Sequence, residues 1–346
     1  MMILSSLRFE YIQGRAALGA GNFGTVRAAR DLQLAATLAV KAVPKVTFDG
    51  GPETYFEEAA RLYDAKHPHV VEVKYACEDE DNIFLAMPLY ERGSLQSLLA
   101  TRRLSNREII AYAIGILTGV HHIHTRNLIH RDIKPSNVLI TDSGQAAVSD
   151  FGLAKHLDRE AGTAEAKVAY LRHAPPEWHD ANVVTTRFDI YQVGATLYRM
   201  VYGDGLFNGA FVRAGETSHA RLQAGRLFEF PQLPHLPEAL RRAIRKAMAP
   251  NPDDRHATCL DMANDLAAID SLLDWRPGST GWSWEHGGAR QTNVTVVAET
   301  PTVWAIESTK RHGTGRRRVT SHCRAGMTRT EAIRAAGRAI RELDES

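Results

Sequence analysis

The chain has 346 residues, of which 44% are hydrophobic and 24% are charged, and its formal net charge is +2. This length predicts two or three domains with a sizeable core, and the near-neutral charge favours no class of partner. Three widely spaced cysteines exclude a disulfide framework and a zinc site, which predicts a reducing, cytoplasmic location. Residues 1–7 lack the features of a signal peptide, and no apolar run reaches the length of a membrane span, so we expect a soluble protein without membrane association.

The first predicted element is a glycine-rich hairpin. Gly19, Gly21, Gly24 and Val26 stand in the pattern G-x-G-x-x-G-x-V, and strand-like residues flank it. A Rossmann-type site would need these glycines to open a helix, whereas residues 25–28 read as a second strand. Because glycine lets backbone N–H groups approach an anion closely, the pattern predicts a hairpin folded over a triphosphate.

A lysine follows in an apolar strand. Lys41 ends the run Leu38-Ala39-Val40-Lys41, where a lone ammonium group would be costly, so it needs an anionic partner. A helix predicted at residues 52–66 offers two glutamates, Glu57 and Glu58. Residues 83–87 then read as a buried strand that runs into a linker.

The next long element is a predicted buried helix over residues 105–124. Ser105 and Glu108 have the spacing of a capping box at its start. His121, His122 and His124 near its end resemble a metal cluster at first sight, but the sequence shows no matching set of further ligands, so we expect a packing role.

Polar residues then gather around two short motifs. Residues 130–137 read H-R-D-I-K-P-S-N, and residues 150–152 read D-F-G after a strand predicted at 146–149. Asp132 can accept a proton from a hydroxyl group, and Asn137 and Asp150 can supply the oxygen ligands that Mg²⁺ prefers. Together they fit a phosphoryl-transfer site, where positioning and charge neutralisation carry most of the catalysis.

These two motifs resemble the catalytic loop and the D-F-G turn of the eukaryotic-type (Hanks-type) protein Ser/Thr kinases. The resemblance covers about residues 7–272. It implies an α+β, bilobal fold with a β-rich N-lobe (7–87), a hinge (88–93) and a helical C-lobe (94–272). It also implies an enzyme that uses ATP and Mg²⁺ to phosphorylate a protein substrate.

The resemblance assigns roles to the polar residues. Lys41 would touch the α- and β-phosphates and pair with Glu58, which lies at the family's distance before the His67-Pro68 turn, in preference to Glu57. Asp132 would act as base or orienter of the acceptor. Lys134 would steady the γ-phosphate, and its position is typical of Ser/Thr rather than tyrosine kinases. Asn137 and Asp150 would hold the metal.

The resemblance also places an adenine pocket. Met87 would lie at its back, and Ala39 and Leu139 would sandwich the ring. The carbonyl of Pro88 and the backbone N–H of Tyr90 would bond the base. Most relatives have an acidic residue where Pro88 stands, but a proline still offers its carbonyl.

The activation segment, residues 150–177, departs from the family in one respect. Usual members have a threonine shortly before the motif that here reads Ala174-Pro175-Pro176-Glu177, and this chain has none there, which puts the acceptor in doubt. Thr163 is the Ser/Thr candidate for autophosphorylation, because the cation of Arg131 can recruit a phosphate.

Three structural roles follow from the same resemblance. Glu177 should pair with Arg255, and Asp189, at the start of an apolar helix over 190–201, should cap the backbone of the catalytic loop. An apolar stack should link the two lobes through Leu62, Val73, His130 and Phe151.

Two alternatives to a protein kinase remain. A pseudokinase scaffold predicts the loss of Lys41, Asp132, Asn137 or Asp150, and all four are present. A kinase-fold enzyme acting on a small molecule or RNA is kept open by the missing threonine.

Residues 275–346 lie outside the resemblance. Four of the five tryptophans occur here, which predicts a small folded α+β accessory module rather than a disordered tail. We expect strands at 293–299, 302–309 and 316–323 and a helix at 328–343. Twelve Lys and Arg against seven Asp and Glu make the module basic, with a cluster at 310–318. This cluster predicts docking of a partner or autoregulation, with nucleic-acid binding as the alternative.

Overall fold

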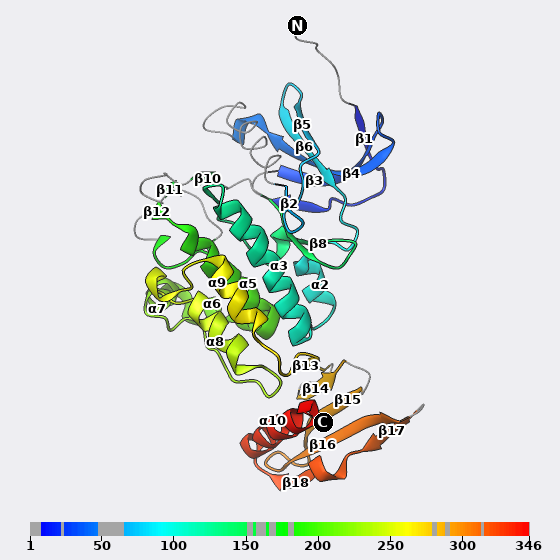
Figure 1. Ribbon diagram of the computed structural model, residues 1–346, viewed down its shortest axis with the longest axis vertical. Coiled ribbons are helices and arrows are strands. Elements are labelled where there is room, and N and C mark those ends of the chain that lie inside the picture. Colours follow the sequence, from blue (N-terminus) through cyan, green and yellow to red (C-terminus); the bar gives the residue numbers. More distant parts are fainter. Residues whose placement is uncertain are drawn as a thin grey trace.

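The computed structural model describes residues 8–21, 24–47, 66–150, 155–156, 164–165, 171–178, 183–278, 282–287, 291–312 and 315–345. Three parts follow one another along its long axis: a β-rich part, a helical part, and a small part with one sheet and one helix (Figure 1). The α+β, bilobal fold with a C-terminal module is thereby confirmed. No helix among these residues is long and apolar enough to cross a membrane.

The N-lobe is an antiparallel sheet in the order β1-β3-β4-β6-β5, with β2 paired to β3. The β2–β3 pairing sets Gly19 opposite Val26 and Gly21 opposite Gly24, so the predicted glycine-rich hairpin is confirmed. A 3-10 turn, Lys45–Thr47, follows β4. The strands are β1 (Phe9–Tyr11), β2 (Gly19–Gly21), β3 (Gly24–Asp31), β4 (Ala36–Pro44), β5 (Tyr75–Glu78) and β6 (Asn82–Pro88).

The C-lobe packs around two buried helices, α3 (Asn106–His124) and α5 (Thr186–Tyr202). The predicted capping box at the start of α3 is confirmed, because Ser105 accepts from the Glu108 N–H and the Glu108 carboxylate accepts from the Ser105 N–H. Helix α5 begins four residues earlier than expected, because the Thr185 hydroxyl caps it by accepting from the Arg187 N–H. The other helices are α2 (Leu95–Thr101), α6 (Asp204–Ala214), α7 (Ser218–Gln223), α8 (Glu238–Ala247) and α9 (Cys259–Ala267).

Short strands and 3-10 turns lie between the helices of this lobe. Strand β7 pairs with β10, β8 with β9, and β11 with β12. These strands are β7 (Leu128–Ile129), β8 (Val138–Ile140), β9 (Ala146–Val148), β10 (Lys155–His156), β11 (Ala164–Glu165) and β12 (Val183–Val184). The 3-10 turns are Pro135–Asn137, Gly215–Thr217 and Pro252–Asp254.

The C-terminal module is an antiparallel sheet in the order β13-β14-β15-β16-β17, with β18 also paired to β16 and with helix α10 packed against it. Its strands are β13 (Trp275–Pro277), β14 (Ser283–His286), β15 (Thr292–Ala298), β16 (Trp304–His312), β17 (Gly315–Arg318) and β18 (Arg324–Met327), and α10 is Arg329–Glu345. Trp275 and Trp284 pack with alanines of α10 to form its core.

Most of the expected elements of the module are confirmed, with one correction. The expected helix is present, and Thr328 and Glu331 bond to each other at its start. The strands expected at 293–299 and 302–309 are also present, with small shifts at their ends. The expected strand at 316–323 is wrong in extent, because β17 ends at Arg318 and a 3-10 turn, Thr320–His322, follows. Strands β13, β14 and β18 were not expected.

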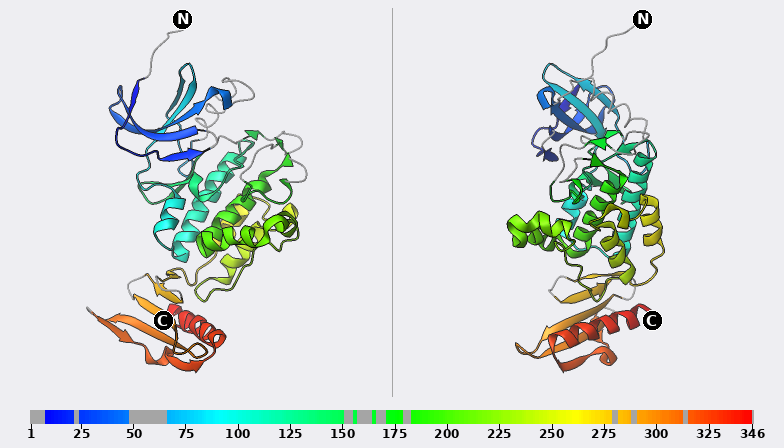
Figure 2. Two further views of the ribbon diagram at one scale, coloured as in Figure 1. Left: turned by 180° about the vertical axis from the view of Figure 1, so that it is seen from behind. Right: turned by 90° about the vertical axis from the view of Figure 1, so that its left-hand side faces the viewer.

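The module lies at the end of the C-lobe far from the N-lobe, as two further views show (Figure 2). Arg107 of α3 forms a two-pronged ion pair with Asp274, at 2.7 and 3.0 Å. Asp344 of α10 accepts from the Leu272 N–H at 2.7 Å and from Trp275 Nε1 at 3.0 Å. The connecting residues are therefore held by polar contacts from both sides.

Candidate active site

The catalytic loop, residues 130–137, is held from below by two buried side chains of α5. The Asp189 carboxylate accepts from the backbone N–H groups of His130, at 2.9 Å, and Arg131, at 2.8 Å. Gln192 accepts from the Ile133 N–H and donates to the Arg131 carbonyl, both at 2.9 Å. These bonds fix Arg131 at a φ of 68°, a conformation that non-glycine residues seldom adopt.

The expected capping by Asp189 is confirmed, whereas Gln192 was missed. The available signal was its spacing, because a polar residue three positions after Asp189 lies on the same face of the helix. Its amide is fully buried, and a buried amide needs partners.

The charge of Asp189 is balanced by His124 at the end of α3. His124 Nε2 lies 2.7 Å from the Asp189 carboxylate, and its Nδ1 lies 3.8 Å from the Cys259 sulfur. Burial opposes the charge on His124, but the interactions with Cys259 and Asp189 outweigh it and raise the pKa of His124 to about 10. Burial likewise opposes the charge on Asp189, but His124 holds the pKa of Asp189 below its ordinary value.

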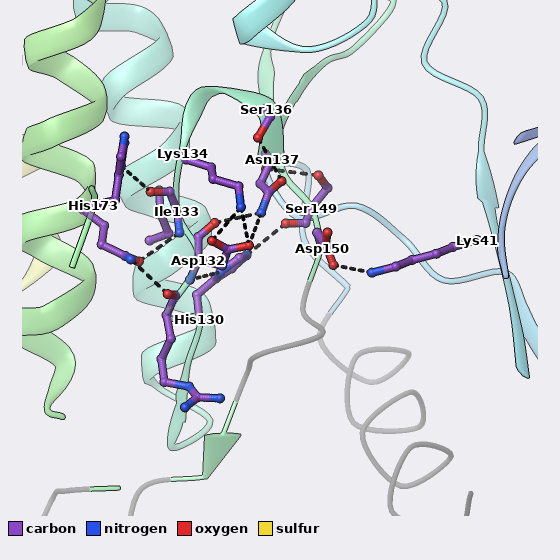
Figure 3. Close-up of polar contacts among 12 residues, drawn as sticks. Lys41, His130, Asp132, Ile133, Lys134, Ser136, Asn137, Ser149, Asp150 and His173 are labelled. Atoms are coloured by element: carbon purple, nitrogen blue, oxygen red, sulfur yellow. Dashed lines mark hydrogen bonds and ion pairs between the residues drawn. The ribbon is translucent and has the colours of Figure 1, made fainter. Parts of the chain in front are cut away.

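The side chain of Asp132 is the centre of a hydrogen-bonded cluster (Figure 3). Lys134 Nζ lies 2.8 Å from both of its carboxylate oxygens. Asn137 Nδ2 donates to Asp132 Oδ2 at 2.8 Å and to the Asp132 carbonyl at 2.9 Å. Because the amide nitrogen of Asn137 is used in this way, its Oδ1 is turned to the other side, 3.3 Å from the Ser136 hydroxyl.

Asp150 is brought beside this cluster by the β8–β9 hairpin. The Asn137 carbonyl accepts from the Ser149 N–H at 2.8 Å and from its hydroxyl at 3.1 Å. His130 Nε2 donates to the Ser149 carbonyl at 3.0 Å. Asp150 then takes a positive φ of 64°, and its carboxylate faces Lys41 (Figure 3).

The buried side chain of Lys41 forms an ion pair with Asp150. Lys41 Nζ and Asp150 Oδ1 are 2.5 Å apart, and the Lys41 side chain is only 7% exposed against 34% for Asp150. The partner expected from the sequence, Glu58, lies outside the described residues, as does its alternative Glu57. Leu62, Phe151 and Thr163 also lie outside them, whereas Val73 and His130 of the expected stack are buried.

Ala39, Met87 and Pro88, three of the residues assigned to the nucleotide, lie on two paired strands. Ala39 of β4 is opposite Met87 of β6 in register, and Leu38 is opposite Pro88. Leu139 lies in β8, which bridges to Ser94 after the hinge, and the Tyr90 carbonyl accepts from the Gly93 N–H at 3.0 Å.

Gly24 is required by the shape of the glycine-rich hairpin. Its φ is 124°, and a Cβ built on it would lie 2.0 Å from the Ala42 carbonyl oxygen. No other residue fits this position without moving the backbone.

The end of the activation segment is fixed by two contacts. Glu177 and Arg255 form a two-pronged ion pair at 2.6 and 2.7 Å, as expected. His173, which sequence reasoning missed, is fully buried, with Nδ1 3.1 Å from the Ile133 carbonyl and Nε2 3.3 Å from Arg199 Nη1. Because arginine can only donate, His173 accepts at Nε2 and donates to the catalytic loop at Nδ1. Burial and the Arg199 charge lower the pKa of His173 to about 3.

The histidines near the end of α3 serve different contacts. His124 binds Asp189, and the ring of His122 stacks on His67 at a centroid distance of 4.6 Å. Across the described ranges, no three His, Cys, Asp or Glu side chains gather as they would around a metal ion. Two oxygen-bearing side chains such as those of Asn137 and Asp150 are a different arrangement, of the kind in which substrate and water oxygens complete the shell of a Mg²⁺ ion.

Comparison with known proteins agrees with this geometry. The family model for the protein kinase domain matches residues 12–266. The chain is 28% identical over 256 residues to the serine/threonine-protein kinase PrkC of Bacillus subtilis, covering 72% of this chain and 39% of PrkC. It is 27% identical over 263 residues to the probable serine/threonine-protein kinase PknB of Lactococcus lactis, with 74% and 41% covered. It is 31% identical over 275 residues to mouse mitogen-activated protein kinase kinase kinase 5, with 77% and 19% covered. The match thus spans about two fifths of the length of the bacterial relatives.

Proposed function

This chain belongs to the protein kinase family, and we propose that it is an ATP-dependent protein serine/threonine kinase. One observation carries the proposal: the Asp132–Lys134–Asn137 cluster is set beside the Lys41–Asp150 pair. A proton acceptor, two cations and two oxygen ligands are thus held together between the lobes, as phosphoryl transfer requires.

Asp132 receives or orients the hydroxyl of the protein substrate. Its carboxylate is fixed by Lys134 and Asn137, so it cannot rotate away from the acceptor. Lys134 Nζ, 2.8 Å from both carboxylate oxygens of Asp132, balances the charge of the phosphoryl group as it moves. Such a positioned base contributes about 10²–10⁴-fold to the rate.

The residues present fit ATP and Mg²⁺. Gly24 lets the glycine-rich hairpin pack closely on β4, because a Cβ there would meet the Ala42 carbonyl oxygen, and the oxygens of Asn137 and Asp150 are hard ligands. When bound, Mg–ATP supplies the phosphoryl group and neutralises part of its charge. Lys41 holds the α- and β-phosphates, and Glu58 is its proposed second partner.

The hinge region and the strands around it hold the nucleotide. Gly19, Gly21, Gly24 and Val26 cover its phosphates. Ala39 and Leu139 sandwich the adenine, with Met87 behind it. The Pro88 carbonyl and the Tyr90 N–H bond its edge.

An assay with labelled ATP tests this function. The purified chain is incubated with Mg–ATP and a generic protein acceptor, and label is followed in the acceptor and in the chain itself. Asp132→Asn, which keeps the shape of the side chain, is the control. Transfer to protein by the wild type alone supports the proposal. Binding of ATP without any transfer would favour a pseudokinase, and transfer only to small molecules or RNA would favour a different acceptor.

We further propose autophosphorylation at Thr163, because Arg131 of the catalytic loop is a cation that can recruit a phosphate on the activation segment. Mass spectrometry after incubation with Mg–ATP tests it. A fully active enzyme with an unmodified Thr163 would contradict it.

For the organisation of the chain we propose a kinase unit at residues 7–272 and an accessory module at 275–346 that regulates or recruits. The module has its own core of tryptophan and alanine side chains, separate from that of the C-lobe. The unpaired thiols of Cys77, Cys259 and Cys323 support a cytoplasmic location.

A further inference from the structure

Helix α6 and the end of the activation segment together form an exposed surface. Leu171 of the segment is 62% exposed, and Val212 of α6 is 76% exposed. Phe211 and Val212 follow Asn208 by three and four residues, so the three share one face of α6. Arg172 joins the two elements, because its guanidinium lies over the Phe211 ring and donates to Asn208 Oδ1. We call these five residues the α6 surface.

The α6 surface is near the proposed catalytic base. Arg172 precedes His173, whose Nδ1 lies 3.1 Å from the carbonyl oxygen of Ile133, the residue after Asp132. Figure 3 shows His173 beside Ile133 and Asp132. From standard backbone dimensions, the backbone of Arg172 lies within about 15 Å of Asp132, the length of about four extended residues. A protein chain whose acceptor hydroxyl is at Asp132 can therefore reach the α6 surface within about four residues of that hydroxyl.

The guanidinium of Arg172 is held in place but is not neutralised. It bonds the Asn208 amide oxygen at 2.6 Å and lies 5.9 Å from the centroid of the Phe211 ring. Neither group is negatively charged, and among the residues that the structure describes no carboxylate pairs with Arg172. Arginine has five N–H donors in a planar fork that matches a carboxylate or a phosphate group. Most of these donors therefore remain for an anionic partner, and the side chain is already ordered to receive it.

We propose that the α6 surface binds the part of the protein substrate next to its acceptor residue, and that Arg172 selects an anionic side chain there. The inference rests on the proposed protein kinase function. Leu171 and Val212 offer apolar contact area, which favours binding of a protein segment. Arg172 supplies the specificity, because it attracts an anion and repels a cation at the same place. The anion is a carboxylate or a phosphate group, since the fork binds both.

Matched peptides test the proposal with the full chain. Each peptide has one acceptor serine, and Glu, phosphoserine, Ala or Lys occupies one of the four positions on either side of it. The ratio of kcat/KM for the Glu and Lys peptides is measured at each position. The variant Arg172→Glu reverses the charge, and Arg172→Gln removes it but keeps an N–H donor for Asn208. The matched control, Arg245→Glu, reverses the charge of an exposed arginine on α8, which lies toward the C-terminal module (Figure 1).

We expect the wild type to prefer Glu over Lys at least about fivefold at one or more positions, the factor that a strong exposed ion pair supplies. Arg172→Gln should bring this ratio close to one, and Arg172→Glu should invert it. Arg245→Glu should keep the ratio of the wild type. A higher kcat/KM with phosphoserine than with Glu at the same position would support the site and identify a phosphorylated substrate.

Three results would overturn the proposal. The first is a wild type that treats Glu and Lys peptides alike at every position. The second is an equal change for all peptides in Arg172→Gln, or an equal shift of the ratio in Arg172→Gln and Arg245→Glu, because the role of Arg172 would then be structural or a general effect of charge. The third is labelling of a generic protein acceptor but of none of the peptides. No transfer to any acceptor would instead overturn the proposed kinase function, and this inference with it.

Discussion

Lys41 and Asp150, 109 residues apart in sequence, are joined by an ion pair of 2.5 Å between Nζ and Oδ1. We assign Lys41 to the phosphates of ATP and Asp150 to the Mg²⁺ ion. In the protein alone they neutralise each other. The pair therefore links the stability of the unliganded protein to the same two residues that we assign to the binding of Mg–ATP.

The first prediction concerns this pair. Asp150→Ala should abolish phosphoryl transfer and weaken Mg-dependent ATP binding. It should also lower the free energy of unfolding of the unliganded protein by up to about 3–5 kcal/mol, because the buried Lys41 loses the carboxylate with which it pairs. Urea unfolding measures it.

The double variant Lys41→Met/Asp150→Ala is the control. It removes the buried charge as well, so it should be more stable than Asp150→Ala alone. Additive losses would show that the ion pair does not contribute to stability.

A second prediction separates binding from chemistry at Asp132. Asp132→Asn should lower the rate of transfer by about 10²–10⁴-fold, because the amide cannot accept the proton. ATP affinity should stay near that of the wild type, because Asp132 is assigned to the acceptor hydroxyl and the Asn side chain keeps an oxygen for the contacts with Lys134 and Asn137. Rates and ATP affinity are measured side by side. A variant that keeps more than a tenth of the wild-type rate would show that Asp132 is not the base.

A third prediction concerns Gln192, a positioning residue. Gln192→Leu leaves the Ile133 N–H and the Arg131 carbonyl without their partner, which should cost about 1–3 kcal/mol of unfolding free energy. The rate of transfer should fall while the KM for ATP stays unchanged. Gln192→Glu keeps the acceptor for the Ile133 N–H but loses the donor to the Arg131 carbonyl. Its rate of transfer and its free energy of unfolding should therefore lie between those of the wild type and those of Gln192→Leu. A Leu variant with full activity would mean that Asp189 alone holds the loop.

The fourth prediction is a pH dependence at His173. Its pKa is about 3 in the folded protein, because burial and the Arg199 charge disfavour the imidazolium, and ordinary near 6.5 when unfolded. Below pH 6.5 the unfolded chain binds a proton that the folded protein does not. The contribution of His173 to stability is therefore complete above pH 6.5 and is lost as the pH falls toward 3.

The variant His173→Asn tests this pH dependence by comparison with the wild type. Between pH 6 and 4, the unfolding free energy of the wild type should fall more steeply than that of the variant, by up to about 1.4 kcal/mol per pH unit. Parallel curves for the two proteins would contradict the assignment.

Sequence alone predicted the parts of the site that lie in short motifs. The spacing of residues 130–137 and 150–152 identified Asp132, Asn137 and Asp150, and the contact of Glu177 with Arg255 followed from the same resemblance. Gln192 and His173 could not be predicted in this way, because their roles depend on which backbone groups the tertiary fold brings within reach.

In the C-terminal module, too, only the strands with a clear local pattern could be predicted from the sequence. Strand β15 alternates buried and half-buried residues from Thr292 to Val296, and this alternation is visible in the sequence. Strand β13 has three residues and ends in Pro277, and strand β18 has four residues and contains Gly326. Their pairing is therefore decided by the neighbouring strands rather than by local preference.

The contacts of Asp344 set the point during synthesis at which the C-terminal module can fold. Asp344 binds the Leu272 N–H and Trp275 Nε1, which precede it by 72 and 69 residues. Domains generally fold in order from the N-terminus during translation. The C-lobe can therefore be complete while Trp275, fully buried in the folded protein, still lacks both its core and its acceptor. During that interval the nascent chain presents an apolar surface directly below the folded lobe, and residue 344 must leave the ribosome before it is covered.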